Sequence, residues 1–398
     1  MVTKTFKGGT HPPERKERSA STPIQTLRNV SQVVIPVNQH FGAPIQPLVK
    51  VGDQVKRGQK IADADGRMTV PLHASVYGTV KKIEPRMQAN NLEGLAIVIE
   101  PLPGDEAVFM PTLDPFSCTK EEALARVREA GIIGVGGAGF PAHVKFAPPP
   151  NKPIEYVIAN AAECEPYLTI DERVMEEHPE DFIDGIVIVM KIVGATKGIV
   201  GLEDNKTHLV PGLEKAIAAK RSGMDIRVQL LRTKYPQGGE KMLITAITGR
   251  EVPSGGLPMD VGCVVSNVNT LLAVSEAFRK GQPVIDTGLT VTGGACETPK
   301  NLFVPVGMLV QDLFPDVARY DEKKLKRIVM GGPMMGPAVP SMLVPIQKNT
   351  SGVLLMDETE AKAYEEGPCI RCGRCMRACS CRLSPALLNV ALKAGDLD

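Results

Sequence analysis

The chain of 398 residues contains no tryptophan, and aromatic residues make up 4% of it. Few aromatic side chains and a formal net charge of +1 argue against a protein that stacks on nucleic acid or coats it. Long apolar runs are also missing, because the best stretch, Phe182 to Met190, is too short to span a membrane and is followed by Lys191. Met1 to Ala20 is polar and charged, without the apolar core of a secretory signal. We therefore expect a protein that meets a membrane only through a partner.

Four of the nine cysteines stand close together near the end of the chain, in the run CIRCGRCMRACS. Their spacing, C-x2-C-x2-C-x3-C, is the one with which bacterial ferredoxins bind a [4Fe–4S] cluster, because short gaps aim successive thiolates at neighbouring corners of the cube. Zinc is the alternative, but zinc sites usually pair two C-x2-C elements across a longer gap. The expected cluster ligands are Cys369, Cys372, Cys375 and Cys379.

The cysteine run has two irregularities. Ser380 replaces the proline that usually follows, and Cys381 adds a fifth sulfur. In two-cluster ferredoxins the fourth cysteine of one run binds the other cluster, and no second run follows before Asp398. We therefore expect either that Cys379 or Cys381 closes a single cluster locally, or that the chain is truncated before a second run. The remaining four cysteines are scattered along the chain, and we expect them to be buried as small apolar side chains.

Changes in composition divide the chain into parts, beginning with two that are not helical. Residues 1–30 are rich in Lys, Arg, Pro and Ser, and are expected to form an extended arm over another surface or to be partly disordered. Residues 31–103 show short alternating strands such as VVIPV and GTVKKIEP, and resemble the barrel-sandwich hybrid of lipoyl carriers. A carrier needs a lysine on its exposed hairpin, and none lies between Lys60 and Lys81. A structural or docking role is therefore favoured for this part.

The rest of the chain completes a multidomain α/β fold. In residues 104–285, strand patterns (YVIAN, GIVGLED, RVQLLRTK) alternate with helix patterns (EEALARVREAG, DFIDGIVIVMKIVGA, GEKMLITAITG), which predicts a Rossmann-like domain with a parallel sheet. Residues 286–350 return to short strands around one expected helix, VGMLVQDLF, and are predicted to form a small β-grasp (SLBB-like) domain. Residues 351–398 form the iron–sulfur segment, with helices expected on both sides of the cysteine run.

Four glycine-rich or polar clusters follow strands or open helices of the α/β part. GVGGAGFP precedes Lys145, and glycines allow a backbone to approach a phosphate closely. NAAECEP follows directly on the strand YVIA, at the carboxyl end where open α/β sheets bind ligands. GGEK and SNVNT open two further helices. Each alone is equally explained by a tight loop, solvated charges or a helix N-cap, but their joint occurrence favours a nucleotide site.

In this order, the four clusters resemble those of the flavin-binding, NADH-oxidising 51-kDa subunit of respiratory complex I. Together with the arm FKGGTHPPERK, the barrel-sandwich part, GGPMMG and CIRCGRC, residues 5–398 resemble the family of C subunits of the Rnf complex. The resemblance implies an oxidoreductase subunit on the cytoplasmic side of the cell membrane, peripheral to it, that holds FMN and two [4Fe–4S] clusters. Its complex exchanges electrons between ferredoxin and NAD(H) and moves Na⁺ or H⁺. The implied partners are the iron–sulfur B subunit, the membrane subunits and NADH or NAD, with ferredoxin as a further candidate and no nucleic acid.

The same resemblance assigns roles to residues of the four clusters. The glycine loop would lie against the flavin, Phe140 would stack on the NADH adenine, and Lys145 would contact the flavin side. The NAAECEP residues would line the isoalloxazine and nicotinamide pocket, the GGEK residues would continue the NADH face, and the SNVNT residues would reach the FMN phosphate. The cofactor-binding residues implied in this way are Gly136, Gly137, Gly139, Phe140, Lys145, Asn160, Glu163, Glu165, Gly239, Glu240, Asn267 and Thr270.

Three residues depart from the complex I pattern and leave other functions open. Val135 stands where those relatives have Arg, Ala162 where they have Asp, and Lys241 where they have a second Glu. Because these changes alter the local charge, one alternative is an iron–sulfur electron-transfer adaptor with a vestigial nucleotide site. A second alternative is a non-redox assembly scaffold that holds zinc in its cysteines.

Overall fold

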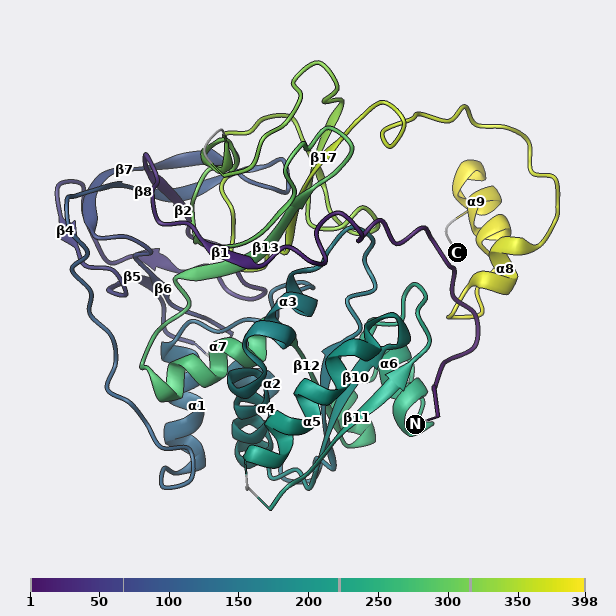
Figure 1. Cartoon of the computed structure of the whole chain (residues 1–398), viewed down its shortest axis with the longest axis horizontal. Coiled ribbons are helices and arrows are strands. Elements are labelled where there is room, and N and C mark those ends of the chain that lie inside the picture. The colour runs from purple at the N-terminus through teal and green to yellow at the C-terminus, as the bar shows by residue number, and fades with distance from the viewer. Residues whose placement is uncertain (1, 67, 221–222, 315–316, 397–398) are drawn as a thin grey trace.

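The computed structural model describes residues 2–66, 68–220, 223–314 and 317–396. Figure 1 shows a β-rich half above a parallel α/β domain, with a short helical segment set apart beside the N-terminal arm. The β-rich half is formed by strands from residues 24–101 and 286–356. None of the helices described is both long enough and apolar enough to cross a membrane.

The N-terminal β-rich part packs two small antiparallel sheets against each other. Its strands are β2 (Val33–Pro36), β3 (Gln46–Pro47), β4 (Gln54–Val55), β5 (Lys60–Asp63), β6 (Leu72–His73), β7 (Gly78–Met87) and β8 (Glu93–Pro101). One sheet has the order β2-β8-β7-β4 and the other β3-β5-β6. Val33 and Ile35 of β2 meet Ile97 and Ile99 of β8 in the core between them. This is the expected barrel-sandwich arrangement.

A mixed sheet continues the same hydrophobic core. Its strands are β1 (Ile24–Thr26), β13 (Asp286–Thr292), β14 (Lys300–Pro305), β15 (Arg327–Met330), β16 (Ala338–Val339) and β17 (Gly352–Met356). The order is β1-β14-β13-β17-β15-β16, with β13 and β17 parallel at the centre and an antiparallel partner outside each. Thus the sheet extends beyond the expected range 286–350. It takes β1 from the arm and β17 from the segment assigned to the cysteines.

The prediction of a helix at VGMLVQDLF, in residues 306–314, is wrong. Only a 3₁₀ turn, Val310–Leu313, is present there. The preceding backbone is extended at Leu309 and pairs with residues 342–346, since Val310 N–H donates to Val344 O at 3.1 Å and Met308 O accepts from Ile346 N–H at 2.8 Å. These tertiary hydrogen bonds use the groups that a helix would need.

The central domain has a parallel sheet with helices on both faces. Its elements are α1 (Lys120–Glu129), α2 (Ala142–Lys145), β9 (Tyr156–Ala161), α3 (Ile170–Glu177), α4 (Pro179–Val193), β10 (Lys197–Glu203), α5 (Val210–Ala219), β11 (Asp225–Leu231), α6 (Glu240–Thr248), β12 (Cys263–Asn267) and α7 (Val268–Arg279). The strand order is β11-β10-β9-β12, all parallel. Successive residues of β9 face opposite cores: Val157 packs with α4 and α7, and Ile158 packs with α6. The expected Rossmann-like alternation is confirmed.

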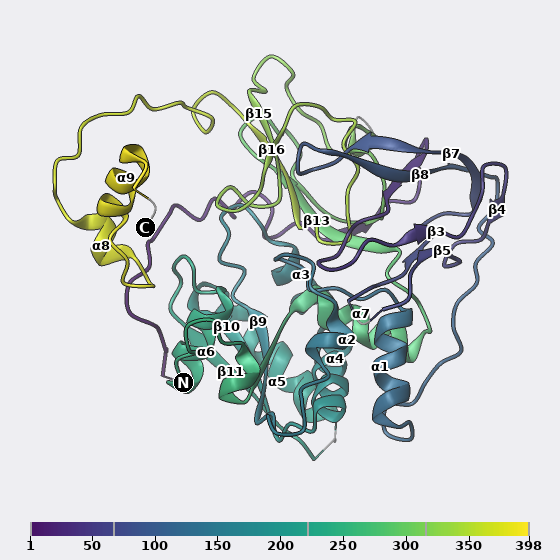
Figure 2. The same ribbon diagram turned by 180° about the vertical axis from the view of Figure 1, so that it is seen from behind.

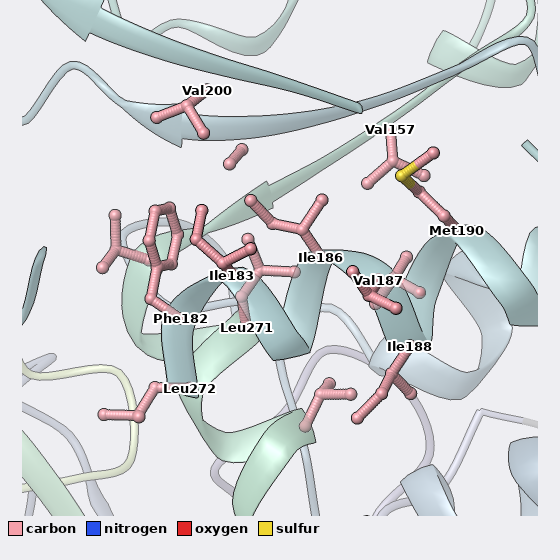
Figure 3. Close-up of a cluster of buried hydrophobic side chains, with 14 of the residues drawn as sticks. Val157, Phe182, Ile183, Ile186, Val187, Ile188, Met190, Val200, Leu271 and Leu272 are labelled. Atoms are coloured by element: carbon pink, nitrogen blue, oxygen red, sulfur yellow. The ribbon is translucent and has the colours of Figure 1, made fainter. Parts of the chain in front are cut away.

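Helices α4 and α7 lie side by side under one face of this sheet (Figure 3). Helix α4 begins at Pro179, which suits a first turn, and ends at Gly194 in the left-handed region. Gly185 lets the helices approach, since a Cβ there would overlap the Leu271 carbonyl. Beside it, the buried carboxylate of Asp184 accepts hydrogen bonds from Arg279, Lys220 and Ser275. Although burial alone would raise the pKa of Asp184, Arg279 and Lys220 lower it.

A buried lysine joins the β-rich half to the central domain. Lys348 Nζ donates to the carbonyl of Pro71 at 3.0 Å and to that of Gly131 at 2.7 Å. Gly131 precedes the glycine loop. Burial lowers the pKa of this ammonium group to about 7. Two donated hydrogen bonds can be made by a neutral amine as well as by an ammonium group.

The C-terminal segment is reached through a long extended stretch (Figure 2). It contains α8 (Arg374–Ala378), within the cysteine run, and α9 (Pro385–Ala394), after it. The helix expected before the run is wrong, because residues 357–373 form no helix. Pro368 lacks an N–H and disfavours helical backbone at Gly367 before it.

Candidate functional site

The carboxyl ends of β9 and β12 mark the point where the order of the strands in the sheet reverses. From β9 the chain moves outward to β10 and β11, and then returns to β12 on the other side of β9. Asn160 near the end of β9 is the register partner of Asn267 at the end of β12. Ligands of open α/β sheets bind in the crevice at such a switch point.

The glycine loop lies over this point. Val135 N–H donates to Thr270 Oγ1 at 3.0 Å, and a Cβ on Gly136 would lie 3.8 Å from Asn267 Nδ2. The N–H groups of residues 136–138 have no acceptor within the described parts of the chain. Residues 136–138 are exposed, and a Cβ at Gly137 would meet nothing within 4 Å, so the loop is open on this side. A cavity of about 430 Å³ borders Val135 and Thr270 on the side toward β13.

The start of α7 is held by a buried carboxylate. Asn267 caps the helix by accepting from Asn269 N–H at 2.8 Å. Both amide groups donate to Asp171 of α3, Asn267 Nδ2 at 2.8 Å and Asn269 Nδ2 at 2.6 Å. Burial raises the pKa of Asp171, while these two hydrogen bonds oppose the rise. The polar end of α7 is therefore fixed beside the glycine loop.

The NAAECEP and GGEK clusters contact each other. Asn160 Nδ2 donates to Gly238 O at 2.8 Å, and Gly238 N–H donates to Cys164 Sγ at 3.2 Å. Gly239 is the N-cap of α6. The Oδ1 atom of Asn160 is buried and has no hydrogen-bond donor among the described residues.

Glu163 is the most perturbed of the expected site residues. Its backbone is left-handed, with φ of 48°, and its side chain is buried. One carboxyl oxygen accepts from Asp171 N–H at 2.7 Å, and the other lies 3.6 Å from Lys16 Nζ and accepts no hydrogen bond from the residues described. Burial raises the pKa of Glu163 to about 8, against the attraction of Lys16.

Glu165 turns toward the mixed sheet rather than toward the glycine loop. Its Oε2 accepts from Met334 N–H at 2.9 Å, in the GGPMMG segment after β15. Gly332 is required there, because a Cβ would overlap the Glu165 carboxylate. Burial raises the pKa of Glu165, and its Oε1 atom finds no donor in the described structure.

The remaining expected residues lie at the rim. The ring of Phe140 stacks on that of Phe41 from the β-rich part, with centroids 6.0 Å apart. Lys145, at the end of α2, forms an ion pair of 2.6 Å with Glu240, the first residue of α6. The structure thus brings Gly136, Asn267 and Thr270 together, and joins Lys145 to Glu240.

Sequence reasoning missed Lys16, Asp171 and Asn269. Lys16 belongs to the FKGGTHPPERK motif, which supports the family resemblance without indicating a role for the lysine. Asp171 carries no signal beyond being a polar residue at a helix start, and Asn269 belongs to the SNVNT cluster, of which the resemblance singled out only Asn267 and Thr270. Their importance comes from contacts between segments about 100 residues apart along the chain.

The helix α8 lies within the cysteine run, with Cys375 on it and Cys379 at its C-cap. Gly373 and Arg371 have left-handed backbone that turns the chain between the first cysteines. Two sulfurs accept backbone hydrogen bonds, Cys369 Sγ from Arg371 N–H and Cys379 Sγ from Leu383 N–H, both at 3.4 Å. The part of the chain that the structure describes has no group of three or more side chains already gathered as metal ligands.

The glycine loop and the polar strand ends match known families. A family model described as the Nuo51 FMN-binding domain matches residues 127–276, and one described as the RnfC barrel sandwich hybrid domain matches residues 4–102. The crystal structure of the NAD+-reducing [NiFe]-hydrogenase in the air-oxidized state is similar to the chain, with a TM-score of 0.51 and 26% identity, covering 60% of this chain and 47% of that one. The central domain is thus of the Nuo51 FMN-binding class.

Curated relatives match nearly the whole chain. The C subunit of the proton-translocating ferredoxin:NAD(+) oxidoreductase complex of Clostridium ljungdahlii is 44% identical over 98% of this chain and 84% of its own length. The corresponding C subunit of the Na(+)-translocating complex of Acetobacterium woodii is 42% identical over 97% of this chain and 86% of its own. That of the Vibrio cholerae ion-translocating oxidoreductase complex is 40% identical, and the chain spans about half its length (51%). The chain belongs to the family of C subunits of Rnf-type ion-translocating ferredoxin:NAD(+) oxidoreductase complexes.

Proposed function

We propose that this chain binds FMN and NADH at the switch point of the central sheet and passes electrons between the flavin and a [4Fe–4S] cluster. The observation that carries the proposal is the set of N–H donors in the exposed residues 136–138, which find no acceptor among the described residues and belong to a loop next to Asn267. A flavin mononucleotide needs such donors for its phosphate and polar groups for its ring. The chemistry that FMN supplies when bound is two-electron exchange with NADH and one-electron exchange with a cluster.

The residues of the site fit this group. Backbone N–H groups at a glycine loop favour a phosphate, and the amide of Asn267 is held in place by Asp171. Buried polar atoms on Asn160 and Glu163, without partners among the described residues, remain for the ring. We assign the phosphate to the loop and the start of α7, and the ring to the NAAECEP segment. We assign NADH binding to the residues at the rim: Phe140, Gly239 and Glu240.

The cysteine run is the proposed cluster site. Hydrogen bonds from backbone N–H groups to Cys369 Sγ and Cys379 Sγ stabilise thiolates and tune cluster potentials. The hydrogen bond to Cys379 favours this residue over Cys381 as the fourth ligand. Arginines 371, 374, 377 and 382 surround the run and offset the negative charge of a cluster.

The partners follow from the family. The curated relatives from Clostridium ljungdahlii and Acetobacterium woodii are subunits of ferredoxin:NAD(+) oxidoreductase complexes. We propose that this chain is the peripheral NADH-side subunit of such a complex, on the cytoplasmic side of the membrane. Its partners are the iron–sulfur B subunit and the membrane subunits, with ferredoxin as a further electron partner. We also propose a β-grasp (SLBB-like) identity for the mixed sheet, supported by its parallel central pair.

The test is anaerobic reduction of bound FMN by NADH, followed in the visible absorption band of the flavin. Variants E163A and K145A are compared with the wild type and with E121A, an exposed residue on α1 away from the site. We expect slow or absent bleaching in the first two variants and normal bleaching in E121A. Normal bleaching in both E163A and K145A would remove this site assignment.

A second candidate function is favoured by one specific contact. Because Lys145 already pairs with Glu240 at 2.6 Å, two residues expected to serve FMN and NADH neutralise each other. The candidate is an iron–sulfur electron-transfer adaptor that binds no nicotinamide. Titration of the FMN-loaded protein with NADH separates the two functions, since the adaptor would leave the flavin oxidised.

A further inference from the structure

The N-terminal arm lies along the carboxyl edge of the central sheet. Lys4 pairs with the end of β11, donating to Leu230 O and accepting from Arg232 N–H, both at 2.9 Å. Phe6 is buried in the core beneath α6. Thr10 exchanges backbone hydrogen bonds of 2.8 Å in both directions with Tyr235. The arm is therefore an ordered part of the central domain, and its position brings the following residues to the NAAECEP segment.

Lys16, the last residue of the FKGGTHPPERK motif, has its side chain buried inside the protein. Its Nζ atom donates to three backbone carbonyls of the segment after β9: Glu163 O at 2.8 Å, Glu165 O at 3.1 Å and Leu168 O. The residue is buried, with 7% of its surface exposed. An ammonium group has three protons and a neutral amine has two, so all three hydrogen bonds are made together only by the charged form.

The same ammonium group faces the carboxylate of Glu163. The distance from Lys16 Nζ to Glu163 Oε2 is 3.6 Å, and both side chains are buried. Because burial opposes the charge of each group, it raises the pKa of Glu163 and lowers that of Lys16. The other charged groups that act on this pair come from α3, from the end of β10 and from the 3₁₀ segment Asp204–Leu209 that follows it: Asp171, Glu172, Glu203 and Lys206. Acids outnumber bases here, so the attraction of Lys16 limits the rise in the pKa of Glu163 that burial causes.

We propose that Lys16 is a positioning residue of the cofactor site, which holds the left-handed Glu163 turn and sets the charge that Glu163 presents to the flavin. The part concerning the flavin rests on the proposed function above. The part concerning charge does not, because it is a property of the protein without FMN. The arm motif FKGGTHPPERK thereby acquires a role in the site.

The charge is tested without cofactor by unfolding as a function of pH. In K16M the buried Glu163 loses the attraction of Lys16 and keeps only that of Lys206, so its folded pKa rises further above the unfolded value. The folded state then binds more protons than the unfolded state, and stability falls as pH rises through this range. Because the folded pKa of Glu163 is already about 8 in the wild type, the added slope lies above this value. We expect urea midpoints of K16M to keep falling above about pH 8, where the contribution of Glu163 to those of the wild type levels off. In K16M/E163Q this additional slope is expected to disappear.

Flavin binding is tested in the same variants by fluorescence titration, which has no tryptophan background here. We expect K16M to bind FMN roughly 10-fold more weakly at alkaline pH, and K16M/E163Q to recover part of this loss. K7M, which changes an exposed lysine of the same arm, is expected to behave as the wild type. Circular dichroism establishes that each variant is folded before binding is measured.

The outcomes separate the two proposals. Equal pH slopes in K16M and K16M/E163Q would overturn the role of Lys16, whatever FMN does. Failure of the wild type to bind FMN, with the expected slopes present, would overturn the proposed flavin function and leave the Lys16–Glu163 pairing established. FMN binding by K16M equal to that of the wild type at every pH would overturn the positioning role.

Discussion

Replacing Asn267 perturbs the polar start of α7 in two separable ways. In N267A the helix loses its N-cap, worth about 1 kcal/mol. Asp171 also loses the donor at 2.8 Å, and a hydrogen bond to a charged group is worth about 2 kcal/mol. We therefore expect N267A to lower the free energy of unfolding by about 3 kcal/mol. N267S keeps a cap but cannot reach Asp171, and is expected to lose about 2 kcal/mol.

The assay is urea unfolding of the FMN-free protein, followed by far-ultraviolet circular dichroism because the chain has no tryptophan. FMN affinity is measured in parallel and is expected to fall in both variants, since both remove the amide group beside the glycine loop. Two results would refute the reasoning. One is equal destabilisation by N267A and N267S; the other is a loss below about 0.5 kcal/mol in N267A, within the range of ordinary surface substitutions.

Three further predictions concern a buried ion pair, a buried lysine and the cysteines. D184A removes the hydrogen bonds that Asp184 accepts from Arg279 and should lower the free energy of unfolding in urea by about 2 kcal/mol, because Arg279 itself stays partly exposed. Since the folded pKa of Asp184 is lowered, its contribution is present above the unfolded pKa and lost as pH falls through the folded one, so a loss independent of pH would contradict the account. The free energy of unfolding of the wild type, relative to that of K348M, should rise between about pH 7 and the ordinary lysine pKa of 10.5. In this range the unfolded chain binds a proton that buried Lys348 has released. A difference in free energy that stays constant with pH would exclude the lowered pKa of Lys348. C379S should reduce iron and sulfide content after anaerobic reconstitution and C381S should leave it unchanged, and the reverse pattern would reassign the fourth ligand.

Much of the central domain follows from its sequence. The apolar run of α4 between Pro179 and Gly194, and the alternation of strands and helices around it, predict a doubly wound parallel sheet because each pattern is local. The five buried residues of β17, GVLLM, also form a strand signal. Their expected place was the cysteine segment, because sequence alone does not indicate which sheet a strand joins.

The errors have a common physical cause. VGMLVQDLF has an apolar pattern compatible with a helix, but pairing of Met308 and Val310 with residues 342–346 determines its backbone. Likewise, Lys16 contacts Glu163 from a position 147 residues away in sequence. Long-range contacts of this kind leave no periodic trace in either segment. The glycine loop and Asn267 are recognisable because their chemistry is local: left-handed glycines and a helix cap.

The most direct test of the central claim is simultaneous optical and paramagnetic resonance detection of electron transfer in the anaerobically reconstituted protein. NADH is added to the wild type and to C369S, which is expected to bind FMN but to lack an intact cluster. In the wild type we predict flavin reduction followed by the signal of a reduced [4Fe–4S] cluster, and in C369S flavin reduction alone. A wild-type protein that holds both cofactors and reduces its flavin with NADH, but whose cluster stays oxidised, would contradict the account.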